Sequence, residues 1–141
     1  MVALLAACGR TDVKVVDVND LLRIELGKIV PVSAFLRKPA DIICVLPPYD
    51  GEVRGEVPHR EQINDRLKSI PLFPNEGWLM VFVKDDVVTL QTFKAQPISP
   101  LRAHEGKPKG FRPVQCTSVE RAVFTRVDSI SFTGALMLGE Q

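Results

Sequence analysis

Hydrophobic and polar residues alternate in short runs along much of the chain, a pattern typical of β-strands. The clearest run spans residues 77–93, in which two β-rich arms flank a short charged connection. Its first arm is almost continuously apolar, which indicates a central strand covered on both faces. Its second arm alternates Val88, Leu90 and Thr92 with Thr89, Gln91 and Phe93, so one face is expected to meet solvent. The segment therefore predicts a β-hairpin that turns at the charged connection.

The amino-terminal part of the chain has a weaker strand pattern. Residues 13–18 mix β-branched and charged side chains, which predicts a strand entering a sheet. Residues 21–32 begin with apolar positions that alternate with charged ones, the period of a half-buried strand. Asn19 and Asp20 leave a second interpretation open, because both residue types cap short helices.

Two further strand regions follow. Residues 42–46 are entirely apolar and predict a buried strand, which ends at the turn-forming sequence of residues 47–51. Near the carboxyl terminus, residues 121–127 and 129–138 are rich in β-branched and aromatic side chains. They predict either a second hairpin or one long bent strand.

One segment has the period of a helix. Ile63, Leu67 and Ile70 are spaced to lie on one face of a helix over residues 61–70, which ends before Pro71. The sum of these elements predicts a mainly β fold, a small β-sandwich with one short α-helix at residues 61–70.

Two irregular, proline-containing segments interrupt the strands, at residues 47–60 and 96–113. Rigid scaffolds commonly carry binding residues on such loops. We therefore take Tyr49, Arg102 and His104 as candidate binding residues, since exposed Tyr and Arg side chains are enriched at interface hot spots. For Tyr49, packing inside the fold is an equal alternative.

Composition limits the class of protein. A length of 141 residues suits one domain with a real core, and a hydrophobic content of 45% argues against general disorder. The net charge is +1, and no basic stripe or aromatic platform points to nucleic acid. No apolar stretch approaches the roughly 20 residues that cross a bilayer.

The sequence shows no reaction centre. It contains neither a Gly-x-Ser-x-Gly nucleophile motif nor a phosphate-binding glycine loop. His104 and Glu105 lie in a Pro/Gly/Lys segment where solvated side chains are the ordinary expectation. The cysteines lack paired metal-ligand spacing, and His59 lies far from His104 in the sequence. We expect no catalytic residues, no metal and no cofactor.

The first residues resemble the lipobox of bacterial lipoproteins, Leu-Ala-Ala-Cys, at positions 5–8. The preceding apolar run is short and lacks a basic start, so residues 1–7 are interpreted as the end of a truncated signal peptide. The resemblance implies that the thiol of Cys8 carries a lipid. Gly9, in place of the Asp that retains such proteins at the inner membrane, implies the outer membrane. The alternative is a buried first strand in which Cys8 is a small hydrophobic residue.

This resemblance sets the expected organisation: a lipidated tether over residues 8–12 and a single β-rich periplasmic domain over residues 13–141. If Cys8 is lipidated, Cys44 and Cys116 remain as an even pair in an oxidising compartment. A disulfide between them would close a loop of about 73 residues and contribute about 4 kcal/mol to stability.

A broader likeness extends over much of the chain. A Cys-containing strand that ends in Pro-Tyr, a short helix, a Trp-led hairpin and a second Cys resemble small periplasmic lipoproteins. Some of these are immunity proteins against toxins that a type VI secretion system delivers. The likeness implies a membrane-anchored binding protein that inhibits a periplasmic or envelope protein by occlusion. The alternative is a structural or assembly lipoprotein of the envelope.

Overall fold

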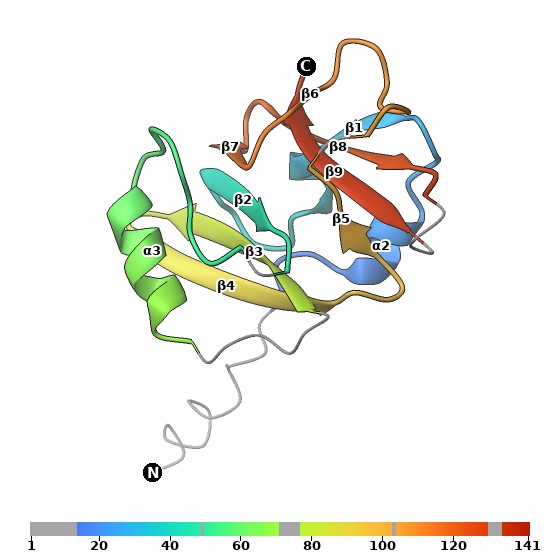
Figure 1. The fold of residues 1–141 in the computed structure, drawn as a ribbon. Coiled ribbons are helices and arrows are strands. Elements are labelled where there is room, and N and C mark those ends of the chain that lie inside the picture. Colours follow the sequence, from blue (N-terminus) through green and yellow to red (C-terminus); the bar gives the residue numbers. More distant parts are fainter. Residues whose placement is uncertain (1–13, 49, 71–76, 103, 130–133) are drawn as a thin grey trace.

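The computed structural model describes residues 14–48, 50–70, 77–102, 104–129 and 134–141, which form two β-sheets and a small number of helices. The mainly β, sandwich-like fold expected from the sequence is confirmed (Figure 1). The five-stranded sheet contains β1 (Ile29–Pro31), β8 (Ala122–Val127), β9 (Ala135–Glu140), β5 (Ser99–Pro100) and β6 (Arg112–Pro113). The four-stranded sheet contains, in spatial order, β4 (Val87–Lys94), β3 (Gly77–Lys84), β2 (Ile42–Leu46) and β7 (Cys116–Ser118).

The hairpin β3–β4 forms as predicted. Lys84 pairs with Val87, and the two connecting residues, Asp85 and Asp86, have φ values of 48° and 65°. Positive φ at both central positions is what a two-residue hairpin turn requires, and Asp tolerates that conformation better than most residues. β3 is a central strand with six consecutive buried residues, whereas β4 is an outer strand and partly exposed.

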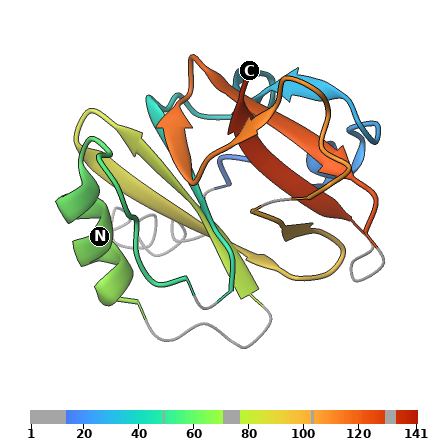
Figure 2. The same ribbon diagram turned by 45° about the horizontal axis from the view of Figure 1, so that its top comes forward.

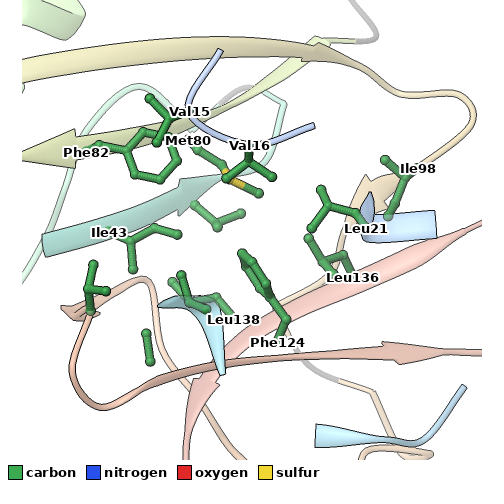
Figure 3. Close-up of a cluster of buried hydrophobic side chains, with 14 of the residues drawn as sticks. Val15, Val16, Leu21, Ile43, Met80, Phe82, Ile98, Phe124, Leu136 and Leu138 are labelled. Carbon is green, nitrogen blue, oxygen red and sulfur yellow. The ribbon is translucent and has the colours of Figure 1, made fainter. Parts of the chain in front are cut away.

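The main hydrophobic core fills the space between the two sheets. Ile43, Met80 and Phe82 of the four-stranded sheet meet Phe124 and Leu136 of the five-stranded sheet (Figure 3). Because apolar residues alternate with a period of two, each strand contributes every second side chain to this layer.

A second apolar layer covers the opposite face of the four-stranded sheet. Helix α3 (Arg60–Lys68) lies against that face, so the sheet is enclosed between α3 and the other sheet (Figure 2). Ile63 and Leu67 are buried in this layer, as the helical spacing predicts, and pack in one cluster with Leu79 and Val81. The helix expected over residues 61–70 is therefore confirmed, with its last turn ending at Lys68.

Trp78 belongs to the core, as its position at the start of an apolar strand predicts. Its indole ring is fully buried and stacks on Phe93 with ring centroids 4.4 Å apart. The indole N–H donates to the carbonyl oxygens of Lys94 at 3.1 Å and Ile98 at 2.9 Å. These bonds satisfy the only polar group of a side chain that would otherwise be costly to bury.

The strands expected over residues 13–18 and 21–32 are wrong, although residue 13 lies outside the described part of the chain. Residues 14–17 are irregular, and helix α2 (Val18–Leu22) follows. The carboxylate of Asp17 accepts a hydrogen bond from the backbone N–H of Asn19 at 2.9 Å and caps this helix. Only the short strand β1 forms afterwards. The short helix left open as the alternative therefore forms, although its capping residue is Asp17 and not Asn19 or Asp20.

The carboxy-terminal segments form the hairpin and not the single bent strand. β8 pairs with β9 in antiparallel register from Ala122 opposite Glu140 to Val127 opposite Ala135. The predicted loop over residues 96–113 is more ordered than its composition suggests. Its ends form β5 and β6, which pair with β9.

Cys44 and Cys116 form a disulfide across β2 and β7, which confirms the expected pairing. The two cysteines lie directly opposite each other in the antiparallel register, 72 positions apart in the sequence. Their Cα atoms are 4.0 Å apart, slightly closer than the 4.4–6.8 Å usual for disulfides. The bond ties the short outer strand β7 to the sheet.

Glu140 joins the two sheets at the end of β9. Its carboxylate accepts hydrogen bonds from the hydroxyl of Thr117 on β7 and from the guanidinium of Arg112 on β6. The guanidinium of Arg121 lies 3.7 Å away. The Thr117 hydrogen bond, assisted by the two arginines, holds the pKa of Glu140 below its usual value although burial acts in the opposite direction.

This lowered pKa predicts a pH-dependent stability. The charged form stabilises the fold fully above the usual glutamate pKa near 4.5, and the contribution is lost as the pH falls through the lower folded value. We expect Glu140→Gln to reduce the free energy of unfolding by about 1–3 kcal/mol at pH 7. Urea unfolding should show the difference shrinking below pH 4.5.

The matched control is Glu25→Gln, because the side chain of Glu25 is 73% exposed and its ion pair with Lys28 lies on the surface. This variant should leave stability nearly unchanged at both pH values. A Glu140→Gln deficit that stays constant from pH 7 to pH 3 would contradict the assigned role of the charge.

Candidate functional site

The two irregular segments singled out from the sequence meet at one cavity. It has a volume of about 300 Å³, and its lining includes Val45 of β2, Pro100 of β5 and Pro113 of β6. Residues 47–60 contribute Pro47 and Arg54 to its lining, and residues 96–113 contribute Pro100, Leu101, Arg102 and Pro113. The two proline-containing loops therefore meet at one place in the fold.

The floor of the cavity is apolar. Val45 at the end of β2 and Leu138 on β9 belong to different sheets, and Val114 lies between β6 and β7. The backbone N–H of Val45 donates to the carbonyl of Gln115 at 2.9 Å, beyond the last paired residues of β2 and β7. The cavity therefore opens where the chain crosses from one sheet to the other.

A buried carboxylate organises the polar wall of the cavity. The side chain of Asp50 is only 3% exposed and accepts a hydrogen bond from the guanidinium of Arg102. Arg54 donates to its other oxygen at 3.2 Å, and the amide of Gln115 donates at 3.4 Å. A buried carboxylate is stable only with such partners, so Asp50 fixes one end of both arginines.

Gln115 fixes the loop around Asp50. Its amide oxygen accepts from the backbone N–H of Arg54 at 3.0 Å, and its amide nitrogen donates to the carbonyl of Glu52 at 3.0 Å. The Gln115 amide thus bonds backbone groups of the loop as a neighbouring strand would. These bonds therefore fix the loop at residues 52–54 to the segment that leads into β7, the strand that carries disulfide-bonded Cys116.

Both arginines remain accessible. The side chains of Arg54 and Arg102 are 60% and 61% exposed, although one nitrogen of each is bound to the buried Asp50. Glu52 lies beside Arg54, with its carboxylate 3.5 Å from Nε, and is itself 60% exposed. The wall presents positioned N–H donors toward solvent next to an apolar floor.

Of the candidate residues that the structure describes, one lies at the cavity and one does not. Arg102 lines the cavity, whereas Tyr49 lies outside the described residues. His104 does not line the cavity, and its ring nitrogen Nδ1 accepts from the backbone N–H of Gly106 at 2.9 Å. This bond closes a local turn and gives His104 a structural role in the loop.

Three residues of the site were not recognised from the sequence: Asp50, Arg54 and Gln115. Asp50 precedes a glycine, a pair that indicates a turn but no burial. Its burial depends on residues 52 and 65 positions away. No local pattern encodes such contacts, although an acidic residue between a proline pair and two loop arginines is a weak signal.

Elsewhere in the described part of the chain, no group of three or more His, Cys, Asp or Glu side chains is arranged to hold a metal ion. His59 lies apart from His104, with its Nδ1 2.7 Å from the amide oxygen of Gln62. Among the described helices, none has the length and apolar character needed to span a membrane.

Comparison of the chain with protein-family models, with curated proteins and with solved structures finds no match, so the residues described above carry the functional argument alone.

Proposed function

We propose that the protein is a lipid-anchored periplasmic binding protein that inhibits a protein partner by occlusion, in the manner of an immunity protein. The observation that carries this proposal is the convergence of both proline-containing loops on one cavity with two positioned arginines. Arginines that are already held in place lose less conformational entropy on binding, which favours their use at an interface.

The disulfide supports the proposed compartment. Disulfides persist in oxidising environments such as the bacterial periplasm and are rare in the cytosol. The Cys44–Cys116 bond is therefore what an exported domain would contain. It also leaves Cys8 as the odd cysteine, in the position that the lipobox resemblance assigns to the lipid.

The position of the first described residues suits a tethered domain. The amide oxygen of Gln91 on β4 accepts from the backbone N–H groups of Val15 at 2.9 Å and Val16 at 3.1 Å. β4 and β7 are the two outer strands of the four-stranded sheet, and the cavity lies on the β7 side. Residue 14, from which an anchor would continue, therefore lies beside β4, the outer strand opposite β7.

Arginine truncation tests the binding role. Arg102→Ala removes a partner from buried Asp50, so it is compared with Arg102→Lys, which keeps a cation beside that carboxylate. We expect both variants to weaken partner binding, by about 1–3 kcal/mol for Arg102→Ala, with the melting temperature of the Arg102→Lys protein little changed. The partner is captured from envelope extracts with residues 9–141, identified by mass spectrometry and titrated.

The control for this test is Arg66→Ala, an exposed arginine on α3 whose side chain lies outside the cavity. It should bind the captured partner as tightly as the parent protein does. Equal affinities for the Arg66→Ala and Arg102→Ala proteins would place the interface elsewhere and contradict the proposed function.

A second prediction concerns the anchor. With a complete signal peptide upstream, the protein should fractionate with the membrane, because several acyl chains on one cysteine give stable anchoring. Cys8→Ser should move it to the soluble periplasmic fraction. The double variant Cys44→Ala/Cys116→Ala is the control, since it removes cysteines but should leave the protein membrane-bound. A Cys8→Ser protein that stays in the high-salt membrane pellet would contradict lipidation.

A further inference from the structure

The cavity combines an apolar surface with two cationic side chains, as a binding site for an amphipathic anion requires. Its floor is formed by Val45, Val114 and Leu138, and its rim by Arg54 and Arg102. A volume of about 300 Å³ lies at the small end of the range for ligand sites. It suits one side chain and an adjoining charged group, and not an extended ligand.

The arginines retain unused donors. A guanidinium carries five N–H groups, and within the described residues the hydrogen bonds of both guanidinia go only to Asp50. Asp50 lies on the buried side, so the remaining N–H groups of two exposed side chains are available to solvent. Paired N–H donors of this kind bind carboxylates in a bidentate manner.

We propose that the cavity binds an aliphatic side chain of a polypeptide together with a carboxylate next to it. The aliphatic group would contact the floor, and the carboxylate would bind the outward N–H groups of Arg54 and Arg102. The proposal rests on the proposed function and names the chemistry that the partner presents. The carboxylate comes either from an acidic side chain beside the aliphatic residue or from the carboxyl terminus.

Glu52 competes with such a ligand. Its carboxylate lies 3.5 Å from Nε of Arg54, and the side chain is 60% exposed, so it can move away. Asp50 differs because it is buried and shared by both arginines. Removing the charge of Glu52 should therefore strengthen binding of an anion, and would weaken binding of a cation.

The test uses three small probes with the 141-residue protein, followed by NMR shifts of the Leu101 and Leu138 methyl groups. N-acetyl-leucine carries a terminal carboxylate, N-acetyl-aspartyl-leucinamide a side-chain carboxylate, and N-acetyl-leucinamide none. We expect at least one acidic probe to bind with a dissociation constant on the order of millimolar and at least tenfold more tightly than N-acetyl-leucinamide. Which acid binds identifies the source of the carboxylate.

Variants distinguish specific binding in the cavity from non-specific electrostatic attraction of an anion to the protein. Glu52→Gln should tighten binding of the acidic probe about two- to fivefold and leave the affinity for N-acetyl-leucinamide unchanged. Its matched control is Glu25→Gln, an exposed glutamate outside the cavity lining, which should have no effect. Arg102→Lys should weaken the acidic probe about fivefold or more, because lysine cannot bind in a bidentate manner.

Three results would overturn the proposal: equal binding of acidic and amide probes, no methyl shifts at 20 mM probe (about tenfold above the expected constant), or inorganic phosphate binding as tightly as the acids. The last result would mean that the floor contributes nothing. If the probes fail while the captured partner still depends on Arg102, the inference is wrong and the proposed function stands. If the acidic probes do not bind and partner binding is also independent of Arg102, the proposed function is overturned as well.

Discussion

The fold depends on one constraint: β2 and β3 are apolar on both faces. Every residue of β2 and six consecutive residues of β3 are buried, so both faces of their sheet must be covered. The five-stranded sheet covers one face and α3 the other (Figure 2). The chain must then travel from the end of β2 around the sheet edge to reach α3, and this path creates the loop that contains Asp50 and Arg54.

That loop must have a fixed conformation, because it buries the carboxylate of Asp50. Asp50 is stable inside the protein only while cationic or amide donors surround it, and removing one partner of a buried ion pair commonly costs about 3–5 kcal/mol. Arg102 comes from the other loop, and Gln115 from the segment that leads into the disulfided strand β7. The contacts that stabilise buried Asp50 are therefore the same contacts that determine the shape of the cavity. A partner would meet side chains that are already positioned.

Local patterns were enough to predict much of the architecture. The charged turn of β3–β4, the single-face spacing of Ile63 and Leu67, and the apolar run of β2 each lie within one segment, so the sequence reveals them directly. The amino-terminal strands failed because a cap at Asp17 decided between two patterns of similar strength. Position on an irregular loop selected Arg102, which lines the cavity, and equally His104, which does not.

The rest of the site depends on contacts between distant segments. Asp50 meets Arg102 across 52 positions, and Gln115 reaches Asp50 across 65. Which side of a loop is buried is decided by the packing of two sheets, and composition contains no record of it. The same holds for Glu140, whose partners Thr117 and Arg112 come from two different strands.

The central claim is that function resides at the junction of the two loops. Hydrogen–deuterium exchange of the protein, alone and with its captured partner, tests this most directly. The account predicts that the partner slows exchange in residues 50–60 and 99–115 and leaves α3 and β4 unchanged. Protection confined to α3 or to the outer edge of β4, with the two loops exchanging as in the free protein, would contradict it.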